Sequence, residues 1–315
     1  MKFYKFIVIL LFIAFFFLHL GCYNKEVKSN SIKIGYIPIA DCLQLYVAQE
    51  KGFFTKHGLS AELVPLQGGP IIIEALVSKN VDVGFSNVVS LLIGRSKGVP
   101  IVGITGGPLE TESRKTHALM VLDSSQISHP KDLSGKTIAV NALRNIEHVA
   151  LMQFLEKTGV PAENVKVVEA PFPQMEGILK NKSVDVIMTI EPYISLASNN
   201  KTAHTLAYPY TEVRPRSVVS TYNVRSDWLT QNREVAKKLA LAIAEATEFI
   251  SNNDSEARQI LLKYTNVPQE VADKIVIPEF QASFMPEDLQ PWINELVKQG
   301  IIDKSFDSQE VFKQQ

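Results

Sequence analysis

The stretch "KNVDVGF" at residues 79–85 decides the fold, because it returns as "KSVDVIM" at residues 182–188. In both copies a basic and a polar residue precede Val-Asp-Val, and an apolar run follows. Such a run predicts a buried strand that is entered from the end of a helix. The aspartates, Asp82 and Asp185, are expected to hold a turn or a neighbouring backbone N–H. One phrase used twice predicts two halves built on the same plan.

Strands and helices alternate around each copy. Strands are expected at 32–37, 60–66, 81–85 and 100–105, and again at 136–140, 165–170 and 184–190. Helical stretches lie between them, the first of them over 42–58. Strand and helix in alternation with short links are typical of a parallel sheet with right-handed crossovers.

The last third of the chain is mostly helical in pattern, with helices expected at 233–253, 255–265, 269–276 and 288–300. The strands at 117–122 and 218–224 bracket the second half and are expected to be its two hinge connections. The predicted fold class is therefore α/β with two lobes, each a parallel-rich sheet flanked by helices, and a ligand cleft between them. Lobe 1 is assigned residues 31–115, lobe 2 residues 116–217, and residues 218–315 return to lobe 1 and form the C-terminal helices.

The N-terminus has the pattern of an export signal. Lys2 and Lys5 come before the uncharged run "FIVILLFIAFFFLHLGC", which ends in Gly21-Cys22. The end of this run is similar to a bacterial lipoprotein cleavage box, so residues 1–22 are expected to be a signal peptide and Cys22 the lipidated residue. Residues 23–30 would be a polar tether. Cleavage as an ordinary secretory signal and an uncleaved anchor are the alternatives.

Composition and charge exclude several function classes. The chain has 315 residues, 32 Lys plus Arg against 33 Asp plus Glu, and a net charge of −1, which gives no basic excess for nucleic acid. Once Cys22 is acylated, Cys42 is the last thiol, so no intrachain disulfide is expected. The sequence has no nucleophile elbow, phosphate-binding P-loop, HExxH or clustered metal-ligand spacing. Neither a cofactor nor a metal is expected.

Ligands of open parallel sheets bind where the strands end and the helices begin. At these junctions Asp41 and Gln44 have the spacing of a capping box, Gly68 and Gly69 leave the backbone open, and Ser86 or Asn87 can cap the next helix. In the second half "NALRNIEH" (141–148), Pro173 and Pro192 mark helix starts. Six helix starts that face one cleft favour an anion. The alternative is that they are ordinary caps.

Some residues have two interpretations. Glu191 ends an apolar strand and is either a helix cap or a partner for a ligand N–H or O–H. His117, His129, His148 and His204 are scattered and expected to be packed or at the surface, although His148 could reach the cleft. Tyr36, Tyr46 and Tyr193 are core aromatics or stacking surfaces. Cys42 is expected to be a buried filler.

Several segments together carry a family resemblance: "IKIGYIPIADCLQLYVAQEKGFFTKHGLSAELVPLQGG", "EALVSKNVDVGFSN", "KDLSGKTIAV", "NVKVVEAPFPQMEGILKNKSVDVIMTIEPY" and "DLQPWINELVKQGIIDKSFD". They resemble the periplasmic solute-binding proteins of nitrate, sulfonate, taurine and thiamine-pyrimidine ABC importers, the NMT1/THI5-like group. The resemblance implies the two-lobed type II periplasmic-binding-protein fold, which closes on a small ligand and delivers it to a permease and its ATPase.

The resemblance also implies where the protein works. It would be a monomer at the cell envelope, in the periplasm or on the outer face of the cytoplasmic membrane, held by its N-terminal lipid. A nitrate-, sulfonate- or taurine-like oxyanion is the first ligand choice, and a thiamine-pyrimidine or riboflavin-type precursor is the alternative. The expected ligand-binding residues are Asp41, Cys42, Leu43, Gln67, Gly68, Ser86, Asn87, Asn141, Arg144, Asn145 and Glu191.

Within this set, Asp41, Cys42 and Leu43 would act through backbone N–H groups, and Arg144 would pair with a sulfonate or carboxylate or would be a solvated surface residue. Two other classes stay open. Enzymes that share the fold, a pyrimidine synthase and chorismate-processing enzymes, work in the cytoplasm, which the export signal disfavours. A sensory or adhesive surface lipoprotein is the third possibility.

Overall fold

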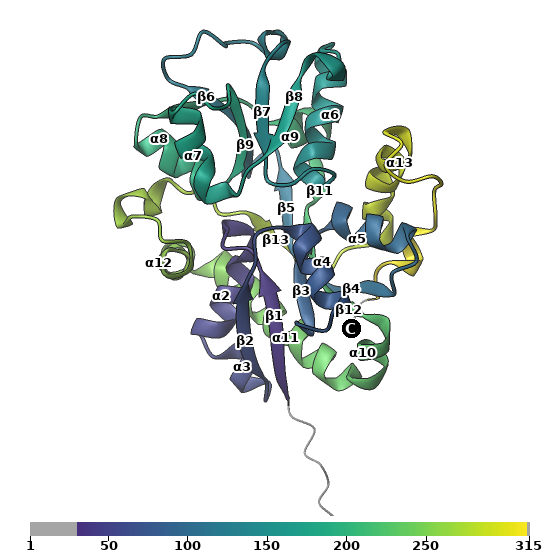
Figure 1. Ribbon diagram of the computed structural model, residues 1–315. Coiled ribbons are helices and arrows are strands. Elements are labelled where there is room, and N and C mark those ends of the chain that lie inside the picture. Colours follow the sequence, from purple (N-terminus) through teal and green to yellow (C-terminus); the bar gives the residue numbers. More distant parts are fainter. Residues whose placement is uncertain (1–29, 314–315) are drawn as a thin grey trace, which may run out of the picture. The chain divides into compact units, whose positions relative to one another are not determined.

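The computed structural model describes residues 30–313 (Figure 1). The predicted signal peptide, the lipidated Cys22 and nearly all of the tether lie outside the described residues. Within residues 30–313, every helix is too short or too polar to cross a membrane.

The first sheet has five strands in the order β2-β1-β3-β12-β4. Their bounds are β1 Ser31–Tyr36, β2 Ser60–Pro65, β3 Val83–Asn87, β4 Ile101–Thr105 and β12 Ser220–Arg225. β1 pairs parallel with β2 and β3, whereas β12 pairs antiparallel with β3 and β4. β12, which follows the second half in the chain, lies between β3 and β4 and runs against both. The other four strands all run in one direction, so the predicted parallel-rich sheet is confirmed and β12 is its one antiparallel strand.

The second sheet repeats this plan in the order β10-β6-β9-β7-β8. Its strands are β6 His117–Leu122, β7 Thr137–Val140, β8 Lys166–Glu169, β9 Val186–Ile190 and β10 Ala203–Ala207. β7 pairs parallel with β8 and β9, and the antiparallel strand here is β6, which pairs with β9 and β10. Each sheet is therefore parallel at its core and has an antiparallel strand beside it.

The repeated Val-Asp-Val phrase has the same geometry in both sheets. The Asp82 carboxylate accepts a hydrogen bond from the backbone N–H of Lys33 at 2.9 Å, and that of Asp185 accepts one from Thr137 at 2.8 Å. Each aspartate also donates its own backbone N–H to the carbonyl of the same partner, at 2.9 Å in both cases. The two aspartates therefore fasten β3 to β1 and β9 to β7, and their predicted structural role is confirmed.

Replacement of either aspartate by alanine is expected to destabilise the protein by about 1 kcal/mol, because each change removes one hydrogen bond between a charged acceptor and a strand N–H. The two losses should be similar, since the two sites repeat one another. Urea unfolding of Asp82→Ala and Asp185→Ala measures them, with alanine at the exposed Asp303 as the control. A loss in the control as large as in the two variants would contradict the assignment.

A third, small sheet connects the other two. Its order is β11-β5-β13, and its bounds are β5 Pro108–Thr111, β11 Arg216–Val218 and β13 Glu279–Phe280. β5 pairs antiparallel with both neighbours. In Figure 1, β5 and β11 lie between the two larger sheets. The connections are therefore β5 and β11, and the expectation that 117–122 and 218–224 are the hinges is wrong. β6 lies inside the second sheet and β12 inside the first, because their apolar residues are buried there.

Helices flank the strands of the first sheet (Figure 1). They are η1 Ala40–Cys42, α2 Leu43–Glu50, α3 Phe53–Lys56, α4 Gly69–Val77, α5 Val88–Ser96 and α10 Ser226–Gln231. The single helix expected over 42–58 is divided, because Gly52 takes the left-handed conformation (φ 71°) and ends α2 there. Pro70 lies in the first turn of α4, as expected from its fixed φ.

The second sheet has its own helices, η2 Pro130–Leu133, α6 Ile146–Thr158, η3 Ala162–Asn164, α7 Phe172–Lys180, α8 Tyr193–Asn199 and α9 Pro209–Val213. Pro173 lies in the first turn of α7 as expected, whereas Pro192 is the residue before α8.

The C-terminal region is helical as expected, with α11 Arg233–Asn252, α12 Asp254–Thr265, η4 Gln269–Lys274, η5 Pro286–Leu289, α13 Gln290–Lys298 and η6 Ser308–Glu310. The segment predicted as a helix over 269–276 is the 3-10 turn η4. α11 buries a stripe at helical spacing, formed by Val235, Leu239, Ala242, Ala246 and Ile250. That stripe packs α11 onto α2 and α3.

Helix α13 contacts the second half of the chain. Trp292 is buried, donates its indole N–H to the carbonyl of Val218 at 3.0 Å and stacks under the Arg214 guanidinium at 4.1 Å. Gln299, just after the helix, donates to the carbonyl of Val149 in α6 at 3.0 Å. The C-terminal segment thus returns to the first sheet and also touches α6 and α9.

Candidate functional site

The carboxyl ends of the strands in the first and second sheets meet at a boundary crossed by hydrogen bonds. The Asn141 side chain donates to the carbonyl of Gln67 at 3.1 Å, and the Ala40 backbone N–H donates to the carbonyl of Glu191 at 3.0 Å. The Tyr193 hydroxyl donates to the carbonyl of Pro38 at 3.2 Å. Sequence reasoning placed the ligand at these strand ends, and the structure brings both sets of ends together. We call this region the boundary.

On the first-sheet side, the expected residues Gly68, Ser86 and Asn87 lie close together around Gly69. The Ser86 hydroxyl donates to the carbonyl of Gly69 at 3.2 Å, and the Asn87 side chain accepts from the N–H of Ser90 at 2.8 Å. A Cβ at Gly69 would lie 2.2 Å from the Asn87 Nδ2 atom, so only glycine fits this position. Asn87 therefore caps α5, and of the two predicted caps, Ser86 and Asn87, the second is confirmed.

The second-sheet side contributes Asn141 and Asn145, which are both buried. Asn145 caps α6 by accepting from the N–H of His148 at 3.1 Å. Arg144, by contrast, is exposed and has a positive φ of 58°, and its guanidinium donates to the carbonyl of Ile301 at 2.9 Å. Arg144 thus ties Ile301, just after α13, to the second half of the chain.

Glu191 is buried and saturated with protein partners. Its carboxylate accepts from the N–H of Ser195 at 3.2 Å, the hydroxyl of Ser195 at 2.8 Å and the N–H of Val276 at 3.1 Å. Burial raises its pKa to about 7, despite these hydrogen bonds. Of the two interpretations of Glu191, the structure shows the cap of α8, with an added link to the chain after η4.

An ion pair lies buried beside the boundary, where the connecting strand β5 meets β6. The Glu110 carboxylate accepts from the Nδ1 of His117 at 2.9 Å, the hydroxyl of Thr116 at 2.7 Å and the N–H of Thr116 at 3.0 Å. Glu110 and His117 are at most 1% exposed. Burial opposes a charge on His117, but the carboxylates of Glu110 and then Asp41 outweigh it and raise its pKa to about 9.

Asp41 lies on the other side of this histidine and has no hydrogen-bond partner for its carboxylate. Its side chain is 1% exposed, and both carboxylate oxygens lack a hydrogen bond. The nearest cation is the Nε2 of His117, 3.8 Å from Oδ2. Burial raises the pKa of Asp41 to about 6, and the charge of His117 offsets this only in part.

The predicted capping box at Asp41 is therefore wrong. Gln44 does not reach back toward the aspartate, because its amide donates to the hydroxyl of Thr247 in α11 at 2.6 Å. Packing of α2 against α11 decides the direction of Gln44 and leaves Asp41 without the expected reciprocal bond.

Two more buried groups complete the set. Glu147, in the first turn of α6, accepts from the Asn145 amide at 2.5 Å. Burial raises its pKa to about 7, and the charge of Asp41 adds to that rise. The Tyr210 hydroxyl in α9 has no hydrogen-bond partner, and its ring lies 4.4 Å from that of His117. We call Asp41, Glu110, His117, Glu147 and Tyr210 the buried cluster.

The buried cluster changes the expected charge of the site. The helix starts at the boundary were expected to offer free N–H groups to an anion. Three of them are occupied, because α5 is capped by Asn87, α6 by Asn145 and α8 by Glu191. The starts of η1, α4 and α7 have no side-chain cap. Glu147 adds a carboxylate at the start of α6, which already complements the positive end of that helix. Three carboxylates, those of Asp41, Glu110 and Glu147, lie around the single imidazolium of His117.

Sequence reasoning missed Glu110, Glu147 and Tyr210, and it placed His117 with the ordinary packed histidines. Glu147 stands two residues after its Asn145 cap, which is a usual place for an acid, so it gave no signal of its own. Glu110 and His117 lie on either side of an exposed turn, and they are buried only once β5 pairs with β11 and β6 pairs with β9.

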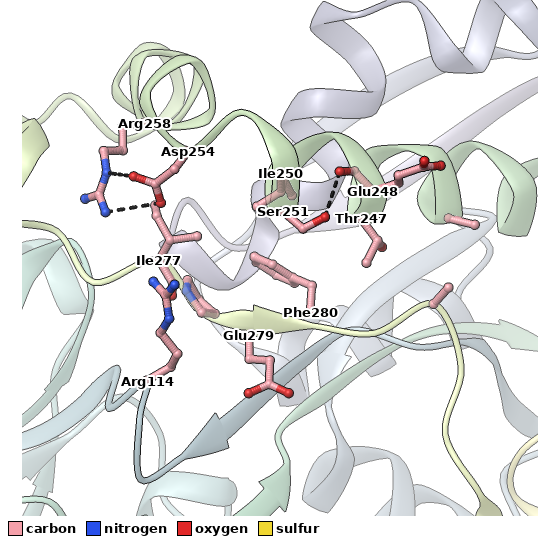
Figure 2. A pocket seen from close by; sticks show the side chains of 13 residues that line it. Arg114, Thr247, Glu248, Ile250, Ser251, Asp254, Arg258, Ile277, Glu279 and Phe280 are labelled. Carbon is pink, nitrogen blue, oxygen red and sulfur yellow. Dashed lines mark hydrogen bonds and ion pairs between the residues drawn. The ribbon is translucent and has the colours of Figure 1, made fainter.

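Two pockets bear on the choice of site. A small one of about 150 Å³ lies on the boundary and is lined by Ile37, Pro38, Ile39, Leu66, Gln67, Pro171, Phe172, Pro173, Gln174 and Tyr193. A larger one of about 670 Å³ lies along α11 and β13 (Figure 2).

Figure 2 shows two pairs among the polar groups of the larger pocket. Arg258 bonds Asp254 at 2.6 Å, and the Ser251 hydroxyl donates to the carbonyl of Glu248 at 2.8 Å. The buried unpartnered groups of Asp41 and Tyr210 belong to the boundary, which is therefore the better candidate despite its smaller pocket.

Comparison with known proteins agrees with this architecture. Residues 40–257 match the family described as NMT1/THI5 like. The chain belongs to that family. The nitrate-binding protein NrtA of Synechocystis has the same type II periplasmic-binding-protein fold, with a TM-score of 0.79 at 18% identity over 91% of this chain and 86% of that one. The alkanesulfonate-binding protein SsuA of Xanthomonas axonopodis pv. citri, solved with MOPS, gives a TM-score of 0.78 at 15% identity over 91% and 99%.

The relatives matched by sequence also have low identity to this chain. The nitrate/nitrite binding protein NrtA of Nostoc is 24% identical over 77% of this chain and 60% of its own length. The nitrate import ATP-binding protein NrtC of Synechocystis is 26% identical over 79% of this chain. The chain spans only 39% of NrtC, so the match concerns one part of that longer protein. The predicted family and fold class are confirmed.

Proposed function

We propose that this protein is the extracytoplasmic solute-binding component of an ABC importer, and that its ligand binds at the boundary. The observation that carries the proposal is the meeting of buried polar side chains from both sheets, above all Asp41 and Asn87 from one and Asn141 and Glu147 from the other. Membership of the NMT1/THI5-like family and the type II fold support it.

The mechanism follows from the connections. Residues 31–115 with 218–315 would form one lobe and residues 116–217 the other, and both would turn about β5 and β11. A ligand that contacts both sides binds the closed arrangement better than an open one and shifts the population toward it. The bonds Asn141–Gln67 and Tyr193–Pro38 would then form on closure. A permease can recognise the closed arrangement, and the protein itself needs no catalytic group.

The anchor and partners complete the proposal. Lipidation at Cys22 would hold a monomer at the outer face of a membrane, beside its permease and ATPase. Incorporation of labelled palmitate that disappears in Cys22→Ala tests the anchor without reference to any ligand. Retention of the label in Cys22→Ala would contradict it.

Ligand binding is tested by thermal shift of residues 23–315 with nitrate, bicarbonate, taurine, ethanesulfonate, hydroxymethylpyrimidine, riboflavin and chorismate. A compound that binds only the native state should stabilise it by about 2.7 kcal/mol at a hundred times its Kd. Nitrate, sulfonate and taurine follow from the predicted oxyanion, and the pyrimidine and riboflavin from the alternative. Turnover of chorismate would instead place the chain among enzymes that share the fold.

A further inference from the structure

The buried cluster indicates which chemical group of a ligand the boundary can bind. This inference rests on the proposal above that the boundary is the ligand site. Two of its groups, Asp41 and Tyr210, are at most 2% exposed and have polar atoms without a hydrogen-bond partner. Buried polar atoms in native proteins are nearly always paired, so an unpaired set in one place calls for a partner that the chain does not supply.

The charge of that partner follows from the neighbours. The charged groups that act on Asp41 are His117 and Glu110, and those that act on Glu147 are His117 and Asp41. His117 pairs with Glu110 at 2.9 Å and lies 3.8 Å from Asp41, so one imidazolium serves the three buried carboxylates of Asp41, Glu110 and Glu147. Within the buried cluster the chain supplies one positive charge for three negative ones. A buried charge is stable when a partner of opposite charge lies beside it.

Two basic residues of the second half bear on the choice between a cation and an anion. Arg214 stacks on Trp292 at 4.1 Å and donates to Gln153 at 2.9 Å, while its Nε has no hydrogen-bond partner. Its charge acts on Tyr210 of the buried cluster. Arg144 bonds the carbonyl of Ile301. An oxyanion beside Asp41 would meet the carboxylates of Glu110 and Glu147 and the start of α6, which Asn145 already caps.

We propose that the boundary holds its ligand by a cationic nitrogen, a primary ammonium group that lies between Asp41 and Glu147 and receives the Tyr210 hydroxyl as a further partner. An ammonium group has three N–H donors, and the unpaired atoms are two carboxylate oxygens and a hydroxyl. Both Asp41 oxygens are covered in the closed arrangement, so the ligand enters only when the sheets have parted. Within the ligand classes named above, this selects aminated compounds over nitrate and plain sulfonates.

The test compares amines with partners that lack only the nitrogen: taurine with ethanesulfonate, and β-alanine with propionate, with propylamine and nitrate as the pure cation and pure anion. Binding is measured by calorimetry on residues 23–315. At least one amine is expected to bind and its partner to bind at least about 30-fold more weakly, as for loss of one member of a buried charge pair.

Variants locate the contact. Asp41→Asn is expected to weaken binding of that amine by a similar factor, and Tyr210→Phe to weaken it less. Asp123→Asn is the matched control, because Asp123 also faces a histidine, His204 at 3.2 Å, but both are exposed. Asp123→Asn should bind like the wild type. If Asp41→Asn does not fold, Tyr210→Phe and the pH profile still decide.

The pH profile reports the groups that face the ammonium, which are Asp41 from η1 and Glu147 from α6, with Glu110, His117 and Tyr210 behind them. Protons compete with the cation for these carboxylates. Affinity is therefore expected to fall by roughly tenfold per pH unit below the pKa of Glu147, about 7, and more steeply below that of Asp41, about 6. An affinity that is constant or rises toward low pH would overturn the assignment.

The remaining outcomes separate this inference from the receptor function. Equal binding of an amine and its deaminated partner overturns the ammonium site, and so does the absence of binding by every amine. If nitrate, a plain sulfonate or a heterocycle binds in that case, the solute-binding function stands. If no compound of either panel binds, both proposals lose their support.

Discussion

Replacement of Glu110 by glutamine is expected to lower the free energy of unfolding by about 3–5 kcal/mol, the usual result of breaking a buried ion pair by removal of one member. Glutamine keeps the size of the side chain, so no cavity forms. The charge that holds His117 protonated is lost, and the amide group turns an N–H donor toward the hydroxyl and N–H of Thr116. His117 must then lose its proton or stay charged without a partner.

Urea unfolding at pH 7 measures this loss, and Glu112→Gln is the matched control because Glu112 lies on the exposed turn of the same segment. The control should differ from the wild type by less than about 0.5 kcal/mol. His117→Ala and the double variant complete a cycle, in which a coupling of at least about 1 kcal/mol is expected for groups in direct contact. A Glu110→Gln variant as stable as the control would show that the pair is not formed in solution.

The expected loss is large because of where the pair lies. β5 carries Glu110 from the first sheet toward the second and pairs with β11, which brings the chain back, so the ion pair sits at the connection between the halves. His117 begins β6 and contacts Asp41 of η1 on its other side. One histidine therefore joins the connecting strand, the second sheet and the first.

How much of this the sequence predicts depends on the range of the interactions. The Val-Asp-Val phrase predicts strand entry correctly because the apolar run and the aspartate act within a few residues, and the same partners recur in both sheets. Helix caps at Asn87 and Asn145 are predictable for the same reason, since the cap and its N–H lie three residues apart.

The missed features are long-range. Glu110 and His117 look like ordinary residues beside a polar turn until β5 pairs with β11 and β13 and β6 pairs with β9. Gln44 is three residues from Asp41, but its amide binds Thr247, 203 positions along the chain. The predicted hinges are wrong because β6 and β12 flank the second half in sequence order, whereas in the structure each one enters a sheet as its antiparallel strand.

Asp41→Asn is expected to stabilise the ligand-free protein at pH 8 by up to about 3 kcal/mol, although it removes a charged residue from the core. The folded pKa of Asp41 is about 6, against 3.8 in its ordinary range, and a rise of two units costs about 3 kcal/mol once the group is ionised. Asparagine escapes this cost, while the loss of attraction to His117 at 3.8 Å makes the net gain smaller. Residues that bind ligand are commonly kept at such a cost to stability.

The pH dependence has a definite sign. Asp41, Glu147 and Glu191 all have raised pKa values, so the folded state holds protons that the unfolded state has lost, and stability falls as pH rises from about 4 to 7. His117, raised from 6.5 to about 9, adds stability below pH 6.5 that is lost as pH rises toward 9. The ligand-free wild type should therefore lose stability steadily from pH 5 to pH 9.

Urea unfolding over that pH range tests whether the buried Asp41 carboxylate destabilises the ligand-free protein. The advantage of Asp41→Asn over the wild type should grow between pH 5 and pH 7 and then stay constant, because Asp41 is fully ionised above its folded pKa. Asp82→Asn is the contrasting variant: its carboxylate accepts the N–H of Lys33, so the same chemical change should destabilise the protein. If Asp41→Asn also destabilises the protein, Asp41 has a partner in the ligand-free protein and needs no ligand cation.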